Sequence, residues 1–178
     1  MNNVSNERFI ISETKETEAV EVIKYMKTIL EETDYLSMNP EEFSYTEDQE
    51  KKAIKKYIES PNRLMLSSTA NGKLVGMLTY DGGSRERNKH TGVVGVSVLK
   101  THWGKSIATN LFEELFKWAA QNGITKKINL SVREDNDRAI ELYKRLGFEI
   151  EGEESMKQFT NGVYYSSVLM GKRIEIEN

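Results

Sequence analysis

The chain has 178 residues, a formal net charge of −3 and no cysteine. This length suits one domain, so we expect a single domain across residues 1–178. Without cysteine the protein can form no disulfide and has no thiol nucleophile. Its two histidines, His90 and His102, are too few for us to expect a metal site. The small net charge and the lack of a long basic run argue against a nucleic acid partner.

The sequence shows neither a secretory signal nor a membrane span. Residues 1–11 are polar and lack the apolar segment of a signal peptide. No apolar stretch approaches the roughly 20 residues that a transmembrane helix requires. We therefore expect a cytoplasmic protein with no membrane partner.

The first third of the chain predicts one strand and two helices. Residues 8–12 indicate a short strand, and residues 17–34 carry apolar side chains at helical spacing. A polar loop follows. Thr46 and Gln49 then have the spacing of a capping box, which predicts that a second helix begins after Thr46. Pro61 marks its exit.

The middle of the chain predicts three strands. Residues 63–68 and 73–80 flank Asn71 and Gly72, which both tolerate positive φ angles, so this segment predicts a hairpin. The valine-rich residues 91–99 predict the third strand.

The next segment predicts a helix, a strand and a second helix. Residues 105–121 show the clearest helical periodicity of the chain, and Gly123 stands where a left-handed stop residue belongs. Residues 127–132 predict a strand. Another helix begins at Asn136 or Asp137.

The C-terminal part predicts a last hairpin. Gly147 ends the preceding helix, and residues 148–156 and 163–171 flank an Asn-Gly turn. Strands and helices mix without strict alternation. The fold class is therefore α/β in the α+β sense: one domain with a mixed, mostly antiparallel sheet flanked by helices.

The segment from Val96 to Ala108 has the composition of an anion site. An apolar strand ends there and a helix begins, so the first N–H groups of the helix lack intrahelical partners. These groups and the helix dipole favour an anion. Gly104 and Ser106 allow close approach to the backbone, and Lys105 adds a positive charge. Alternatively, Gly104 and Ser106 only make a tight strand–helix connection.

A second pattern links Asn136 and Tyr143. They are seven residues apart, so two helical turns bring them to the same side of a helix. On spacing alone, we interpret Asn136 as an N-cap and Tyr143 as a core aromatic residue rather than as functional residues.

Together the two segments resemble the GNAT family of N-acetyltransferases. Its first signature, Q/R-x-x-G-x-G/A at the start of a helix, binds the pyrophosphate of acetyl-CoA and corresponds to residues 103–108. Trp103 replaces the usual glutamine or arginine, and Ser106 replaces a glycine, but both changes keep the backbone N–H donors. The second signature, N-x-x-A-x-x-L/F-Y-x-x-x-G-F, closely matches residues 136–148.

The resemblance implies an acyl-CoA N-acyltransferase fold with acetyl-CoA as cofactor. It also implies that the Asn136 amide contacts the cofactor and that the Tyr143 hydroxyl lies near the thioester sulfur as a general acid. Tyrosine suits this role because its ordinary pKa of about 10 keeps it protonated at neutral pH. The full implied set of cofactor-binding residues is Val96, Ser97, Val98, Trp103, Gly104, Lys105, Ser106, Ile107, Ala108, Asn136 and Tyr143.

The same resemblance implies that strands 91–99 and 127–132 splay apart. Pantetheine then fills the opening like an added strand and pairs with the backbone of residues 96–98. Gly95 is expected to mark the distortion. The alternative is that Gly92 and Gly95 are simply small residues beside bulky neighbours.

The expected reaction is direct attack by a primary amine on the thioester. The acceptor is a small molecule or a protein N-terminus, and the resemblance places its pocket near Glu32 and Tyr35. The candidates for the base that deprotonates the amine are Glu31, Glu32, Glu134 and His90. Each of these four is alternatively a solvated surface group.

Two questions stay open at the level of sequence. A non-catalytic CoA-binding sensor or structural module is the alternative function, since Trp103 and Ser106 depart from the signature. A homodimer is the second open question. Dimers are common among such enzymes, but no decisive interface stripe is visible.

Overall fold

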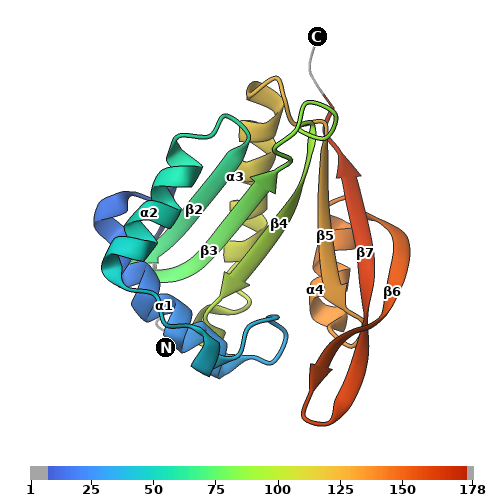
Figure 1. The fold of residues 1–178 in the computed structure, drawn as a ribbon, viewed down its shortest axis with the longest axis horizontal. Helices are drawn as coiled ribbons and strands as arrows, with labels where there is room; N and C mark the ends of the chain where they lie inside the picture. Colours follow the sequence, from blue (N-terminus) through green and yellow to red (C-terminus); the bar gives the residue numbers. More distant parts are fainter. Residues whose placement is uncertain (1–7, 176–178) are drawn as a thin grey trace, which may run out of the picture.

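The computed structural model describes residues 8–175, and seven strands and four α-helices lie within them (Figure 1). The elements are β1 (Phe9–Glu13), α1 (Ala19–Glu32), α2 (Glu47–Ile58), β2 (Arg63–Ala70), β3 (Lys73–Gly82), β4 (Thr91–Val98), α3 (Ile107–Gln121), β5 (Lys127–Arg133), α4 (Asp137–Arg145), β6 (Glu149–Thr160) and β7 (Val163–Arg173). The strands form one sheet in the order β1-β2-β3-β4-β5-β7-β6. All neighbours are antiparallel except β4 and β5, which confirms the predicted mixed, mostly antiparallel sheet.

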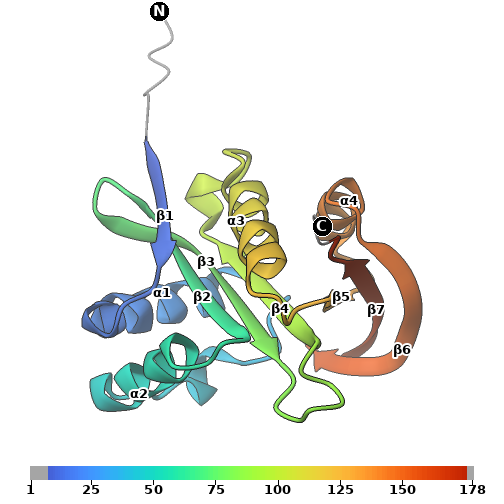
Figure 2. The same ribbon diagram turned by 90° about the horizontal axis from the view of Figure 1, so that it is seen from above.

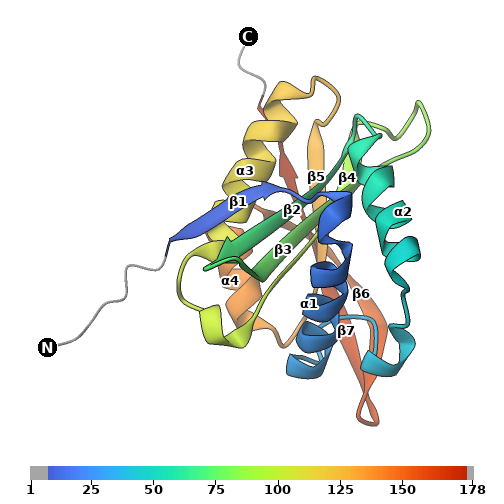
Figure 3. The same cartoon turned by 90° about the vertical axis from the view of Figure 1, so that its left-hand side faces the viewer.

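Helices cover both faces of the sheet. Helices α1 and α2 lie on one face, and α3 and α4 lie on the other (Figures 2 and 3). Alternate residues of a strand point to opposite faces, so Leu64 and Leu66 join the core under α3, whereas Met65 joins the core under α1 and α2. Within residues 8–175, no helix has both the length and the apolar character needed to cross a membrane.

The predicted caps and turns are present. Thr46 Oγ1 accepts the Gln49 N–H at 3.3 Å, and Gln49 Oε1 accepts the Thr46 N–H at 2.8 Å, so the capping box is closed in both directions. The hairpin residues Asn71 and Gly72 have φ angles of 51° and 76°. The predicted turn and cap chemistry therefore sets these local boundaries.

Several boundaries differ from the prediction by a few residues, and two of the differences coincide with positive φ angles. Helix α3 begins at Ile107 rather than at residue 105, because Gly104 and Ser106 adopt φ angles of 78° and 60°, which no right-handed helix contains. Strand β6 continues beyond the predicted end at Met156, which itself has a φ of 52° at a break in the register with β7.

Candidate active site

The parallel strands β4 and β5 stay paired only where they begin. Their register runs from the pair Thr91–Lys127 to the pair Val93–Asn129, and no further pair follows among the described residues. Beyond that point the strands separate, as predicted (Figure 1). A cleft of about 360 Å³ opens at their carboxyl ends. The end of β4, the first turn of α3, helix α4 and the loop after α1 line it.

The separation does not come from a bulge at Gly95, so that prediction was wrong. Strand β4 keeps an unbroken register with β3, and β5 keeps one with β7. The two regular half-sheets instead diverge as a whole. Gly92 fits the alternative prediction, because a Cβ there would collide with the Asp81 carbonyl oxygen.

The turn before α3 is built for close approach to its backbone. Gly104 and Ser106 both have positive φ angles in this turn. A Cβ built on Gly104 would meet no atom within 4 Å, so the space beside its backbone is open. The first helical bond of α3 runs from the Asn110 N–H to the Ser106 carbonyl at 3.0 Å, so the N–H groups before Asn110 have no intrahelical acceptor. These donors beside small side chains fit the diphosphate of acetyl-CoA.

Lys105 does not line the cleft with the rest of this turn. Its Nζ lies 5.8 Å from the centroid of the Phe9 ring, so the side chain leaves the turn on the side of β1. The residues on either side of Lys105 do line the cleft. In this structure the Lys105 ammonium group therefore lies towards β1 rather than in the cleft.

Trp103 is the first residue of the same turn, directly before Gly104, and it lines the cleft. Its indole Nε1 donates to the Val98 carbonyl at 2.7 Å, and its ring carries the Arg138 guanidinium at 4.3 Å from the centroid. Arg138 lines the cleft as well. We did not predict this residue, because its spacing in α4 gives no sign that it meets Trp103.

The last residues of β4 form the floor of the cleft. Val96, Ser97 and Val98 all line it, as predicted. The Ser97 hydroxyl lies 2.9 Å from the Tyr25 hydroxyl of α1. Burial raises the pKa of Tyr25 far above its ordinary value, so Tyr25 is a neutral phenol there.

Tyr143 is both a core aromatic residue, as one interpretation of the sequence had it, and a residue of the cleft. Its ring packs edge-on against Phe112 and Phe148, with centroid distances of 5.7 Å and 6.0 Å. It also lines the cleft. Burial raises the pKa of Tyr143 to about 12, because a phenolate would be desolvated there.

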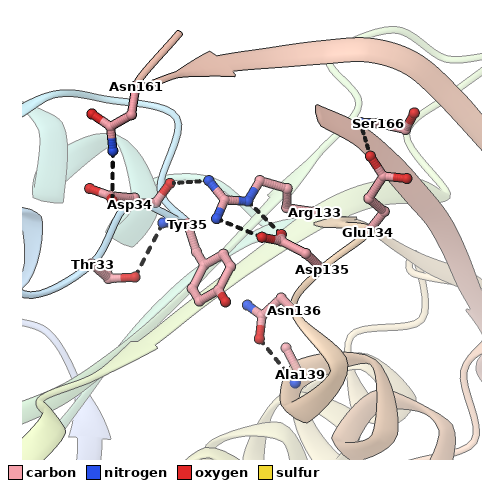
Figure 4. Close-up of polar contacts among 10 residues, drawn as sticks. All are labelled: Thr33, Asp34, Tyr35, Arg133, Glu134, Asp135, Asn136, Ala139, Asn161 and Ser166. Atoms are coloured by element: carbon pink, nitrogen blue, oxygen red, sulfur yellow. Dashed lines mark hydrogen bonds and ion pairs between the residues drawn. The ribbon is translucent and has the colours of Figure 1, made fainter. Parts of the chain in front are cut away.

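Asn136 caps helix α4 and lines the cleft at the same time. Its Oδ1 accepts the Ala139 N–H at 3.3 Å, which satisfies one of the first donors of α4 (Figure 4). No bond of its Nδ2 occurs among residues 8–175. Because Asn136 also lines the cleft, this amide donor is open to a further hydrogen bond there.

Glu32, the last residue of α1, and Tyr35, in the loop after it, also line the cleft. Glu32 Oε2 accepts the Lys100 N–H at 2.8 Å, which ties α1 to the segment after β4. Of the four base candidates only Glu32 lines the cleft. Glu134 Oε1 instead accepts the Ser166 N–H at 2.8 Å, and His90 lies just before the opposite end of β4.

An arginine cluster, which the sequence did not reveal, holds Tyr35 in place. The Arg133 guanidinium donates to both carboxylate oxygens of Asp135, at 2.6 Å and 3.0 Å, and to the Asp34 carbonyl at 3.0 Å. The rings of Tyr35 and Tyr165 lie at 4.4 Å and 4.1 Å from its carbon Cζ. Figure 4 shows the Tyr35 ring beside this guanidinium, with Asp135 and then Asn136 lower in the view.

The arginine cluster joins three segments far apart in the chain. Arg133 ends β5, Tyr35 belongs to the loop after α1, and Tyr165 lies in β7. Asn161 adds a contact of 3.4 Å from the β6–β7 turn to the Asp34 carboxylate (Figure 4). The arginine cluster thus fixes the loop after α1 at the edge of the cleft.

Comparison with known proteins identifies the family. The sequence model of the acetyltransferase (GNAT) family matches residues 27–148, which include both signatures and every part of the cleft. This chain belongs to the GNAT acetyltransferase family. It is an acetyl-CoA-dependent N-acetyltransferase, as the resemblance implied.

Individual relatives agree with this assignment. The chain is 31% identical over 112 residues to the L-amino acid N-acetyltransferase AaaT of Escherichia coli, a match that covers 63% of this chain and 69% of the relative. The structure of a GNAT-family acetyltransferase from Streptococcus pneumoniae superposes on this chain with a TM-score of 0.91 and 27% identity. The match covers 94% of this chain and 100% of that one. A phosphinothricin acetyltransferase from Sinorhizobium meliloti in complex with acetyl-CoA shares the fold, with a TM-score of 0.81 and 13% identity over 93% and 88% of the two chains.

Proposed function

We propose that acetyl-CoA lies along the wall of the cleft formed by β4, residues 103–108 and α4, and that the amine reaches it from the side of α1. One cleft that joins the turn before α3 to the Tyr143 phenol carries this proposal. The diphosphate binds the backbone N–H groups after Trp103, and the pantetheine enters between β4 and β5. The proposed cofactor contacts are the cofactor-binding residues that we predicted from the sequence, because all of them except Lys105 line the cleft.

Tyr143 is the proposed catalytic residue. When bound, acetyl-CoA supplies an activated acetyl group and a sulfur leaving group. Burial raises the pKa of Tyr143 to about 12, so its phenol stays protonated and donates a hydrogen towards that sulfur. A thiolate with an ordinary pKa of about 8.5 is a weaker base than this phenolate, so Tyr143 stabilises the leaving group by hydrogen bonding rather than by complete proton transfer.

Glu32 and Tyr35 are the proposed contacts of the amine. The Glu32 carboxylate is the one base candidate on the cleft wall, and it is already oriented by the Lys100 N–H at 2.8 Å. It attracts an ammonium group and accepts its proton, directly or through water, before attack. The reaction itself then depends on positioning two bound reactants, because the chain has no cysteine to form a thioester of its own.

The proposed acceptor is the primary amine of a small molecule. Relatives named as an L-amino acid N-acetyltransferase and as a spermidine N(1)-acetyltransferase support this class. A panel of amino acids, polyamines and N-terminal peptides, with thiol release from acetyl-CoA as the readout, tests it. Thiol release with small amines supports the proposal, whereas release with peptides alone would redirect it to protein acceptors. Binding of CoA without turnover on any amine would instead favour a sensor or structural module.

We also propose that the protein forms a homodimer through the edge strand β6. Among the described strands β6 pairs with β7 alone, and it exposes Ile150, Met156 and Phe159 to 57%, 64% and 61%. Two copies related by a twofold axis can cover these side chains by pairing their edges. Light scattering should give twice the mass of the chain for the wild type. The variant Phe159→Glu, which places a charge on the proposed interface, should have the mass of a single chain. The control Ile10→Glu, at the opposite edge strand β1, should leave the dimer unchanged.

A further inference from the structure

Arg138 is placed at the phosphate end of the cleft by a contact that the two signatures do not encode. Its guanidinium lies 4.3 Å from the centroid of the Trp103 ring, although α4 and the turn before α3 are separated by a helix and a strand. Both residues line the cleft. The contact therefore brings a cation from α4 to the segment that the proposed cofactor uses for its diphosphate.

Trp103 forms a fixed platform for this cation. The indole Nε1 donates to the Val98 carbonyl at 2.7 Å, which anchors the ring to the end of β4. A guanidinium held over an aromatic face keeps the N–H groups at its edge available for hydrogen bonds. Planar, bidentate donation is the geometry in which arginine binds phosphate oxygens.

Arg138 lacks an acidic partner in the part of the chain that the structure describes. No ion pair or hydrogen bond of its guanidinium occurs within residues 8–175, and Trp103 is its one aromatic contact there. Arg133 provides the contrast, because Asp135 neutralises it with two hydrogen bonds. An unneutralised guanidinium on the cleft wall is therefore available to an anion.

We propose that Arg138 binds the diphosphate of CoA and that Trp103 positions it. This inference rests on the proposed cofactor site and adds a residue to it. Trp103 stands where the family signature has glutamine or arginine, and in this chain a guanidinium from α4 lies over that position. The chain thus supplies from a second helix the cation that its tryptophan displaces, while Lys105 turns away towards Phe9.

Direct binding of CoA to the purified protein tests this role, with isothermal titration calorimetry as the readout. Arg138→Ala should raise the Kd by about tenfold, the scale of a lost charge-assisted hydrogen bond. Arg138→Lys should recover part of the loss. Arg87→Ala, at an exposed arginine in the loop before β4, should bind like the wild type.

Two further binding experiments test which phosphate of CoA Arg138 contacts and whether position 103 can supply the cation itself. If Arg138 binds the diphosphate, Arg138→Ala should weaken CoA and 3′-dephospho-CoA by the same factor; a loss confined to CoA would overturn the assignment in favour of the 3′-phosphate. Trp103→Arg in the Arg138→Ala background should restore tight binding, because it returns a guanidinium to the turn. Failure of this double variant to recover, in a protein that melts like the wild type, would contradict the proposal.

The outcome separates this inference from the proposed function. Suppose that the wild type binds CoA and acetylates amines, and that Arg138→Ala binds CoA with the same Kd. This result would remove Arg138 from the site and leave the proposed function intact. A wild type that does not bind CoA would instead overturn the proposed cofactor site as a whole.

Discussion

The two walls of the cleft are built in different ways. The proposed cofactor wall comes from short stretches of sequence: the end of β4, the turn at residues 103–108 and the first two turns of α4. The proposed acceptor wall, at Glu32 and Tyr35, depends on the arginine cluster, in which Arg133 bonds to Asp34, 99 positions away, and Asn161 contacts Asp34 over 127 positions. Under the proposed function, this chain therefore recognises its cofactor mainly by local backbone geometry and its amine by long-range side-chain packing.

The largest expected effect tests whether the cofactor wall carries the chemistry. Tyr143→Phe should lower kcat by about a hundredfold, the usual contribution of a positioned acid, and change the affinity for CoA far less. The ring contacts with Phe112 and Phe148 survive this change, so the fold should too. Steady-state kinetics and calorimetry on the same preparation measure both quantities. Tyr164→Phe, at an exposed tyrosine of β7, is the matched control, and equal kcat in the two variants would remove Tyr143 from catalysis.

The second prediction addresses the acceptor wall. Arg133→Ala leaves Asp135 unpaired and frees Tyr35, so the free energy of unfolding should fall by about 2 kcal/mol. This is less than for a fully buried pair, because the Asp135 side chain is 40% exposed and that of Arg133 is 7% exposed. The KM for the amine should rise, and the Kd for CoA should stay unchanged.

Arg133→Lys sharpens this second test. Lysine keeps the charge but loses the planar stack between Tyr35 and Tyr165, so it should recover stability more than acceptor affinity. Thermal unfolding and amine saturation curves distinguish the two losses. If an Arg133 variant raised the Kd for CoA as much as the KM for the amine, the two walls would not have separate roles.

The pH dependence of stability gives a third test. Burial raises the pKa of Tyr143 to about 12, above the value of about 10 in an unfolded chain, so the folded protein holds this proton more tightly. The contribution of Tyr143 is therefore complete below about pH 10 and is lost as the pH rises towards about 12. Tyr143→Phe should lose less thermal stability than the wild type between about pH 10 and 11. Identical alkaline losses would contradict a buried phenol.

The smallest expected effect concerns the turn before α3. Ser106 has a φ of 60°, a left-handed conformation that costs a residue with a side chain about 1 kcal/mol more than glycine. Ser106→Gly should therefore stabilise the protein by about 0.5 kcal/mol, after the larger entropy of unfolded glycine is subtracted. Ser106→Ala keeps the Cβ and should bring no such gain in a denaturant titration.

Much of the fold was predictable because its signals are local. The capping box at Thr46, the turn at Asn71 and the stop at Gly147 all follow from the conformations that single residues favour. The resemblance to the family also implied that β4 and β5 would separate, but the cause that it implied was wrong. We expected a bulge at Gly95, and the structure has two regular half-sheets that diverge.

What the sequence did not predict depends on contacts between distant side chains. Nothing in the spacing of Arg133 indicates the rings of Tyr35 and Tyr165 on its two faces. Lys105 was expected to face the cleft because of its charge, but its side chain lies over Phe9 of β1. Arg138 was overlooked because an arginine on a polar helix face is usually solvated, and only its position over Trp103 marks it.

A crystal structure of the protein with bound CoA tests the central claim most directly. We predict that the diphosphate lies on the N–H groups between Gly104 and Ala108, and that the sulfur lies within hydrogen-bond distance of the Tyr143 hydroxyl. CoA bound outside the opening between β4 and β5, or with its sulfur remote from Tyr143, would contradict the account.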